Sequence, residues 1–218
     1  MRYKAICFDF DYTLGDATDA IVAGFTHALT QMGWPAPDRE AVRRTVGYMI
    51  DDAYTMLTGD TDPEHRQQMR PLFVDVAHPM QVEHTPLFPG AIELLSALCQ
   101  RGVRLGVVSS KRTQVLREVM ANNGALEYFE LIVGSDAVSR HKPDPEGLLM
   151  AMEQLGVEPD GLLYCGDTLI DADTAAGAGV DFCAVLNGTT AAAEFSRVPH
   201  VYIAPDLWEL ARWLGVEK

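Results

Sequence analysis

Short apolar runs along the chain alternate with longer segments in which apolar residues recur at helical spacing. Six runs are predicted as β-strands, over residues 4–9, 103–110, 131–134, 162–167, 182–186 and 200–204. Most of them are continuously apolar, as the strands of a parallel sheet buried on both faces must be. Three segments that each end at a glycine are predicted as helices, over residues 89–102, 112–124 and 143–156. This alternation predicts a doubly wound α/β domain.

Residues 15–83 interrupt the alternation, because only helical patterns occur there. The first part has apolar residues at helical spacing, namely Ile21, Phe25, Ala28, Leu29 and Met32. A second helix is expected after Asp38, because aspartate is a favoured N-cap residue. We therefore expect an all-helical domain over residues 15–83, inserted after the first strand into a core made of residues 1–14 and 84–218.

The charge of the chain argues against some classes of partner. Of its 218 residues, 31 are Asp or Glu and 17 are Lys or Arg, which gives a formal net charge of −14. Nucleic acid and anionic membrane surfaces are therefore not expected to bind the bulk surface.

No apolar stretch approaches the roughly 20 residues that a membrane span needs, and the N-terminus meets charge too early for a signal peptide. The four cysteines form no CxxC pair, which favours reduced thiols in a cytoplasmic protein.

Polar side chains follow three of the predicted strands at the points where the strands end. They are Asp9 and Asp11, then Ser109 and Ser110, then Asp167 and Asp171, with Lys142 in the loop before the fourth strand. Ligands of open parallel sheets bind at the carboxyl ends of the strands, so these side chains converge if the three strands are neighbours.

The clustered acidic residues need something that offsets their repulsion. Two carboxylates 4 Å apart repel by about 4 kcal/mol at an effective dielectric near 20. A metal ion, a shared proton or simple exposure on a loop would relieve this. The oxygen-rich set of Asp9, Asp11 and Asp167 favours a hard divalent cation, most simply Mg²⁺. Together with Lys142, the cation would leave room for an anionic group such as a phosphate.

Four short stretches, in chain order, resemble the motifs of the haloacid dehalogenase (HAD) superfamily. They are DFDYTL from Asp9, VVSS ending at Ser110, HKPDP around Lys142, and GDTLIDADTAAGAG ending at Gly179. The helical insertion resembles the type 1 cap of this superfamily. The resemblance implies a Rossmann-like three-layer core with a parallel sheet and a helical cap domain. It also implies a hydrolase acting on phosphoric monoesters, similar to phosphoglycolate phosphatases or pyrophosphatases.

The resemblance also implies a role for each motif residue. Asp9 would be the nucleophile that forms an aspartyl-phosphate, and Asp11 would be the general acid and then the general base. Lys142 would screen the charge between Asp9 and the phosphate. Three further residues would bind the phosphate or support its loop: Thr13, Ser109 and Ser110. Four residues would hold Mg²⁺: Asp9, Asp11, Asp167 and Asp171. Asp11 would do so mainly through its backbone carbonyl, and Asp171 either as a direct ligand or from beside the ligands.

Other activities of the superfamily are less well supported by the residues. Dehalogenases lack the second aspartate of the first motif, whereas Asp11 is present here. Phosphomutases of this group carry a histidine and an arginine in the cap, and the matching positions here are Ile21 and Ile50. A phosphomutase is therefore the alternative enzyme, ahead of a dehalogenase. The alternative from another class is a non-catalytic protein that binds a phosphometabolite or a metal.

The sequence does not identify the substrate or the oligomeric state. Phosphoglycolate, pyrophosphate, nucleoside monophosphates and sugar phosphates are all compatible small substrates, and a monomer or a homodimer is expected. Tyr12 stands where the superfamily most often has glycine, which leaves the size of the substrate open. Lys111 and Arg112, directly after the second motif, are expected to be solvated.

Overall fold

The computed structural model describes residues 2–217 and divides the chain into two compact units. The core unit consists of the residues up to Asp16 and those from Leu87 onward. The helical unit is Ala17–Pro86, compared with the expected insertion over residues 15–83. Each unit is described by itself below.

Backbone hydrogen bonds set the boundary between the two units. They join the segment that leaves the core unit to the segment that returns to it. Gly15 pairs with Leu87 in a β-bridge. The backbone N–H of Phe88 donates to the carbonyl oxygen of Leu14 at 2.9 Å. Because these bonds join the two segments, Gly15 and Asp16 belong to the core, whereas residues 84–86 belong to the helical unit and not to the core as expected.

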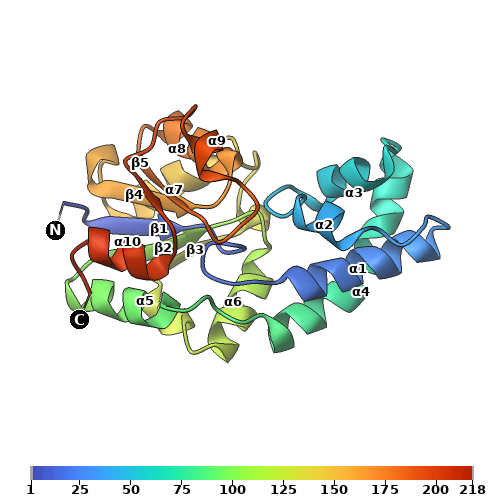
Figure 1. Ribbon diagram of the computed structural model, residues 1–218, viewed down its shortest axis with the longest axis horizontal. Coiled ribbons are helices and arrows are strands. Elements are labelled where there is room, and N and C mark those ends of the chain that lie inside the picture. Colours follow the sequence, from blue (N-terminus) through green and yellow to red (C-terminus); the bar gives the residue numbers. More distant parts are fainter. Residues whose placement is uncertain (1, 218) are drawn as a thin grey trace. The chain divides into compact units, whose positions relative to one another are not determined.

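The core unit contains a fully parallel sheet of six strands (Figure 1). They are β1 (Ala5–Phe8), β2 (Arg104–Val108), β3 (Leu131–Val133), β4 (Leu162–Gly166), β5 (Asp181–Val185) and β6 (Tyr202–Ala204). The strand order is β3-β2-β1-β4-β5-β6. The strands with polar residues at their ends, β2, β1 and β4, are therefore neighbours, which is the condition for those residues to converge.

Helices cover both faces of this sheet. The core helices are α5 (Ala91–Gln100), α6 (Thr113–Asn122), α7 (Glu146–Leu155), α8 (Leu169–Ala178), α9 (Ala192–Phe195) and α10 (Leu207–Trp213), with short 3₁₀ turns at Leu126–Tyr128, Ser135–Ala137 and Pro159–Gly161. In Figure 1, α7, α8 and α9 lie on one face and α5, α6 and α10 on the other. Alternate strand residues such as Cys7 and Tyr164 pack with Leu148 and Ala175 in one buried cluster. This arrangement confirms the predicted three-layer α/β fold.

The helical unit consists of α1 (Thr18–Gln31), α2 (Arg39–Arg43), α3 (Ile50–Thr58) and α4 (Pro63–His84). Asp38 caps α2 as expected, because its side chain accepts a hydrogen bond from the N–H of Ala41 at 3.0 Å. Apolar side chains of the four helices, among them Phe25, Val42 and Tyr54, form a core separate from that of the sheet. The unit therefore has its own buried apolar cluster.

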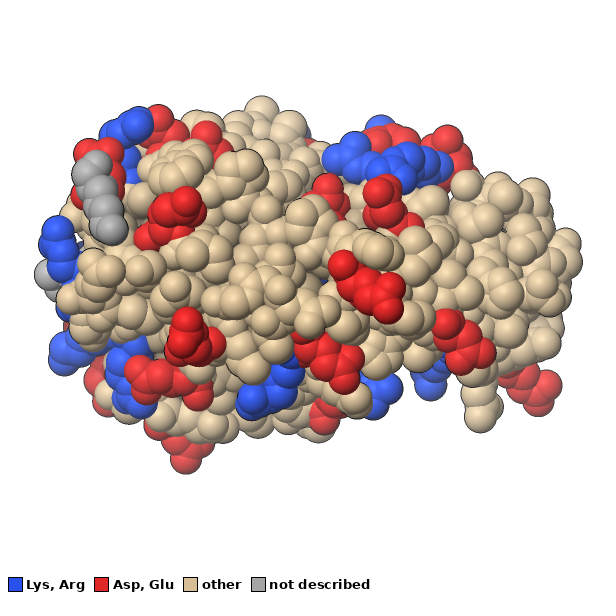
Figure 2. Space-filling model, turned by 90° about the horizontal axis from the view of Figure 1, so that it is seen from below, with Lys and Arg blue, Asp and Glu red and all other residues tan. Residues whose placement is uncertain are grey.

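Charged side chains are spread over the face of the molecule shown in Figure 2. On the face shown in Figure 2, acidic and basic side chains are interspersed, and neither sign forms a continuous patch. None of the helices among residues 2–217 has the length and apolar character that crossing a membrane requires.

We predict that Gly24→Val will destabilise the helical unit. Helix α1 contacts α4 closely there, since a Cβ atom on Gly24 would lie 2.7 Å from Ala77 Cβ and 2.9 Å from the Phe73 ring. Overpacking of this kind costs about 1–3 kcal/mol. Amide hydrogen exchange in α1 and α4 should therefore become faster. Gln31→Val, at an exposed position of the same helix, is the control; equal exchange in the two variants would contradict the prediction.

Candidate active site

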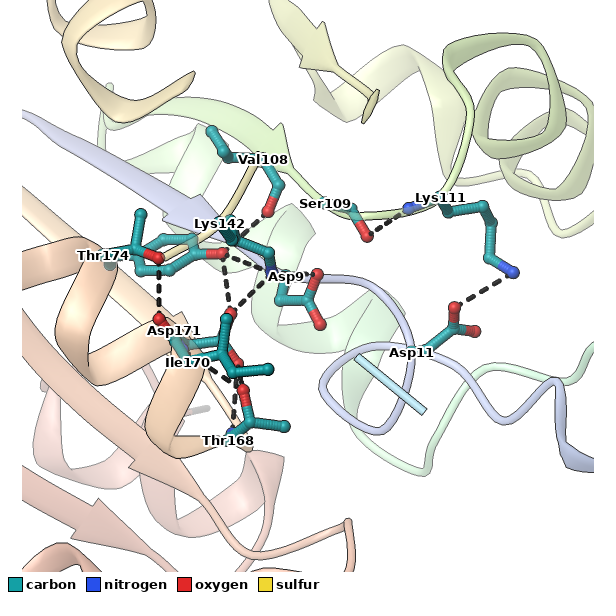
Figure 3. Close-up of polar contacts among 11 residues, drawn as sticks. Asp9, Asp11, Val108, Ser109, Lys111, Lys142, Thr168, Ile170, Asp171 and Thr174 are labelled. Carbon is teal, nitrogen blue, oxygen red and sulfur yellow. Dashed lines mark hydrogen bonds and ion pairs between the residues drawn. The ribbon is translucent and has the colours of Figure 1, made fainter. Parts of the chain in front are cut away.

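Lys142 connects two buried carboxylates at the carboxyl edge of the sheet (Figure 3). Its ammonium nitrogen lies 3.0 Å from Oδ1 of Asp9, directly after β1, and 2.6 Å from Oδ1 of Asp171, in the first turn of α8. The Lys142 side chain is 6% exposed, and those of Asp9 and Asp171 are 2% and 0% exposed. Water therefore screens these charges weakly, and each depends on the others.

Asp171 also fixes the start of helix α8. Its Oδ2 accepts hydrogen bonds from the N–H of Thr168 at 3.0 Å and from the Thr168 hydroxyl at 2.6 Å. The Thr168 hydroxyl in turn accepts from the N–H of Asp171, which completes a capping box. With Lys142 at Oδ1, both oxygens of Asp171 accept hydrogen bonds from groups of the protein. Gly166 is required close by, because a Cβ there would lie 2.5 Å from the Asp171 side chain.

The carboxylates of the site outnumber its nearby positive charge. Burial raises the pKa of Asp9 to about 6, although Lys142 and a hydrogen bond from Ser109 oppose the rise. Burial also raises the pKa of Asp167 well above its usual value, and the carboxylates of Asp171 and Asp9 add to this. Burial alone would lower the pKa of Lys142, but Asp171 and Asp9 outweigh it and raise the pKa. The folded site thus holds its lysine charged and favours added positive charge.

The loop after β1 takes a conformation that glycine adopts most easily. Tyr12 has a φ of 57°, in the left-handed region. Glycine, the residue expected here from the resemblance, adopts this conformation without the steric strain that a side chain brings. The Tyr12 side chain is 2% exposed and so lies within the core unit. The next residue, Thr13, is fully buried, and its hydroxyl oxygen has no hydrogen-bond partner among the described residues.

Asp11 faces a different lysine from Asp9 (Figure 3). Its Oδ2 lies 3.0 Å from the ammonium nitrogen of Lys111, and the Lys111 side chain is 7% exposed. The expectation that Lys111 is solvated is therefore wrong. Its side chain stays close to the protein because the carboxylate at the end of the neighbouring strand attracts it. Arg112 is exposed, as expected.

The two serines after β2 occupy different environments. Ser109 is 6% exposed, and its hydroxyl accepts a hydrogen bond from the N–H of Lys111 at 3.4 Å. Ser110 is half-buried. Both line a small pocket together with Lys142 and residues of the loop that connects β3 to α7.

Sequence comparison assigns the chain to a family. The model of the haloacid dehalogenase-like hydrolases matches residues 6–185. The chain belongs to this family. The predictions that it is an enzyme and that it is a HAD superfamily hydrolase are confirmed by this match.

Relatives of this hydrolase extend over most of its length. It is 30% identical to a phosphoglycolate phosphatase of Rhodospirillum rubrum, over 97% of this chain and 91% of that protein. It is 32% identical to an N-acetylmuramic acid 6-phosphate phosphatase of Pseudomonas aeruginosa, over 86% of this chain and 84% of that one. A crystal structure described as a haloacid dehalogenase-like hydrolase from Bacteroides fragilis superimposes with a TM-score of 0.92 at 36% identity, covering 95% and 99% of the two chains. The predicted resemblance to phosphoglycolate phosphatases is confirmed.

The side chains of this hydrolase fit a hard divalent cation. Carboxylate oxygens of Asp9, Asp167 and Asp171 lie within 4.8 Å of one another. Oδ1 of Asp167 is buried without a hydrogen-bond partner among the described residues. A buried carboxylate oxygen that lacks a donor is a ligand that Mg²⁺ prefers. The loop after β5 approaches the same carboxylate, since a Cβ on Gly188 would lie 2.0 Å from Oδ2 of Asp167.

Sequence analysis missed Tyr164, which links the site to the sheet. Its hydroxyl donates to the carbonyl oxygen of Val108 at 2.7 Å and lies 3.2 Å from the Lys142 ammonium nitrogen. The residue lies within a strand that reads simply as apolar. The sequence feature that could have identified it is a tyrosine inside a strand expected to be buried, because a buried hydroxyl needs a polar partner. Asn187 was also missed; its amide donates to the carbonyl oxygen of Thr13 at 3.3 Å.

We predict that Mg²⁺ will stabilise the protein more at about pH 8 than at about pH 5. The pKa of Asp9 is raised from 3.8 to about 6. In the metal-free protein the folded state therefore favours protonated Asp9. The stability that this residue contributes is fully present below a pH of 3.8 and is lost as the pH rises through about 6. Mg²⁺ binds deprotonated carboxylates, so its benefit grows over the same range. Melting temperatures with and without Mg²⁺ measure this.

The control for this prediction is Asp167→Asn, which removes one of the proposed ligand charges. The increase in melting temperature on adding Mg²⁺ should then be largely lost at both pH values. An increase that is independent of pH, or that persists in Asp167→Asn, would contradict the assignment of the cation site.

Proposed function

We propose that this hydrolase is a Mg²⁺-dependent phosphatase that releases phosphate from a small phosphorylated metabolite through an aspartyl-phosphate on Asp9. The observation that carries the proposal is the contact of Lys142 with Asp9 and Asp171, beside the unpartnered oxygen of Asp167. A buried carboxylate held by an ammonium group and next to a cation site is suited to attack a phosphorus atom. The two related phosphatases support the reaction class.

The nucleophile must be oriented and deprotonated when the substrate binds. Lys142 holds Oδ1 of Asp9 at 3.0 Å. Lys142 itself is held by Asp171 and Tyr164. These contacts fix the direction of the Asp9 side chain before any substrate arrives, which lowers the entropic cost of reaching the transition state. When the carboxylate attacks, a bond forms between Asp9 and phosphorus, and the bond to the leaving oxygen breaks.

Asp11 is proposed to move the protons of both steps. Its Oδ1 is buried and has no hydrogen-bond partner among the described residues. In the first step Asp11 acts in its protonated form, with Oδ2 accepting from Lys111 and the proton on Oδ1, and it gives this proton to the leaving oxygen of the substrate. In the second step it takes a proton from the water that attacks the phosphorus atom of the aspartyl-phosphate, and free Asp9 and phosphate result. A positioned acid or base of this kind contributes about 10²–10⁴-fold to the rate.

The cation is proposed to be held by Asp9, Asp167 and the backbone carbonyl of Asp11. When bound, it neutralises part of the negative charge that the carboxylates and the phosphoryl oxygens bring together. Asp171 was expected either as a direct ligand or beside the ligands. Because both of its oxygens already accept hydrogen bonds, we propose that it acts by holding Lys142.

Hydroxyl groups at the strand ends are proposed to bind the phosphoryl oxygens. Thr13 offers a buried hydroxyl without a partner among the described residues, and Ser109 lies beside Asp9. Ser110, the next residue after β2, is proposed to contact the phosphoryl group as well. The substrate itself is proposed to be a small phosphate monoester, and phosphoglycolate and N-acetylmuramic acid 6-phosphate are the first candidates because related proteins are named for them.

We predict that phosphate release from at least one member of a metabolite panel will require Mg²⁺ and Asp9. The panel contains the two candidates together with pyrophosphate, nucleoside monophosphates and sugar phosphates. EDTA should abolish release, and Asp9→Asn should lower the rate by at least about 10³-fold because it removes the nucleophile. Colorimetric phosphate assays measure both effects.

The matched control is Asp19→Asn, which makes the same change at an exposed position paired with Arg39. It should keep the activity of the wild type. Substantial release by Asp9→Asn, with its fold intact by circular dichroism, would refute the nucleophile. No release by the wild type from any member would refute the phosphatase.

A further inference from the structure

The ion pair of Lys111 with Asp11 is nearly as buried as the contact of Lys142 with Asp9. The side chains of Lys111 and Asp11 are 7% and 12% exposed, against 6% and 2% for Lys142 and Asp9. Removing charges from water is costly, and such pairs often add nothing to stability. A second pair at the same edge of the sheet therefore suggests a purpose other than stability.

The backbone of Lys111 is held on both sides. Its N–H donates to the hydroxyl of Ser109 at 3.4 Å, and its carbonyl oxygen accepts from the N–H of Ser135 at 3.0 Å. Gly134 allows this close approach, because a Cβ there would lie 2.7 Å from the Lys111 carbonyl oxygen and 2.3 Å from the N–H nitrogen of Thr113. These contacts at the ends of β2 and β3 thus fix the position of the Lys111 backbone, from which its side chain extends.

The ammonium group holds only one of the two oxygens of Asp11. It lies 3.0 Å from Oδ2, whereas Oδ1 is buried and has no hydrogen-bond partner among the described residues. A carboxylate anchored at one oxygen cannot rotate freely, so its other oxygen keeps a fixed direction. This is the arrangement that a group exchanging protons with a bound substrate needs, since geometry limits such transfers first.

We propose that Lys111 is a positioning residue, which orients the carboxylate of Asp11 for proton transfer to the leaving oxygen of the substrate. This inference rests on the proposed phosphatase activity and on the proposed role of Asp11 in it. Lys111 does not exchange the proton itself. Its effect should therefore depend on how much protonation the leaving group requires.

The test compares two kinds of phosphate monoester in Lys111→Met. An alkyl phosphate has a strongly basic leaving oxygen that needs a proton, whereas the nitrophenolate of p-nitrophenyl phosphate leaves without one. The quantity measured is kcat/KM, which reports the steps up to departure of the leaving group. Lys111→Met should lower kcat/KM by about 10–100-fold for the alkyl ester, part of what a positioned acid contributes. For p-nitrophenyl phosphate the change should stay within about threefold.

Three further variants separate positioning from a general structural effect. Lys111→Arg keeps the charge and should restore most of kcat/KM for the alkyl ester. In an Asp11→Asn background, Lys111→Met should cause no additional loss, because both changes remove the same function. Arg112→Met, at the exposed neighbouring position, should leave kcat/KM unchanged for both esters.

The outcomes distinguish this inference from the proposed function. If the wild type is active and Asp9→Asn is not, but Lys111→Met loses kcat/KM equally for both esters, the positioning role is overturned and the phosphatase stands. Additive losses in the Asp11→Asn background would also overturn it. If the wild type releases phosphate from neither ester nor from the metabolite panel, the phosphatase is overturned and this inference with it.

Discussion

The shared contact of one buried ammonium group with two buried carboxylates is the constraint on which the rest of the site depends. Lys142 joins the end of β1, through Asp9, to the start of α8, through Asp171, and Tyr164 ties this group to the end of β2. Breaking a buried ion pair by removing one partner typically costs about 3–5 kcal/mol. Asp9, the proposed nucleophile, and the elements around it therefore hold their positions together.

The same constraint leaves a shortage of positive charge. Lys142 serves two carboxylates while Asp167 lies beside them, and burial keeps the pKa of Asp9 and of Asp167 raised. The proposed divalent cation would bring this cluster of three carboxylates and one lysine close to neutral, so a phosphoryl group would meet less repulsion there than the net charge of −14 implies. Asp11 stands apart from this cluster because a separate lysine, Lys111, holds it. The two aspartates of the first motif are thus only two residues apart in the chain but are paired with different lysines.

The strands were predictable from the sequence because each is a compact apolar run, and the neighbouring positions of β2, β1 and β4 satisfy the condition stated for the site. Features that depend on contacts between distant segments were not predictable. The partner of Lys111 lies on another strand end, and Tyr164 reads as one more apolar strand residue. Tyr12 could be recognised as a departure from the usual glycine, but its left-handed backbone is visible only in the structure. The boundary of the helical unit moved because backbone bonds join the segments that flank it.

The central claim is that Asp9 carries the phosphoryl group during turnover. Its most direct test is to mix the enzyme with a substrate carrying a radiolabelled phosphoryl group, to quench with acid within the first turnover, and to map the labelled peptide. The account predicts a label that hydroxylamine removes, as it does from acyl phosphates, located on the peptide that contains Asp9 and absent in Asp9→Asn. Active enzyme that never becomes labelled, or that carries the label on a peptide without Asp9, would contradict it.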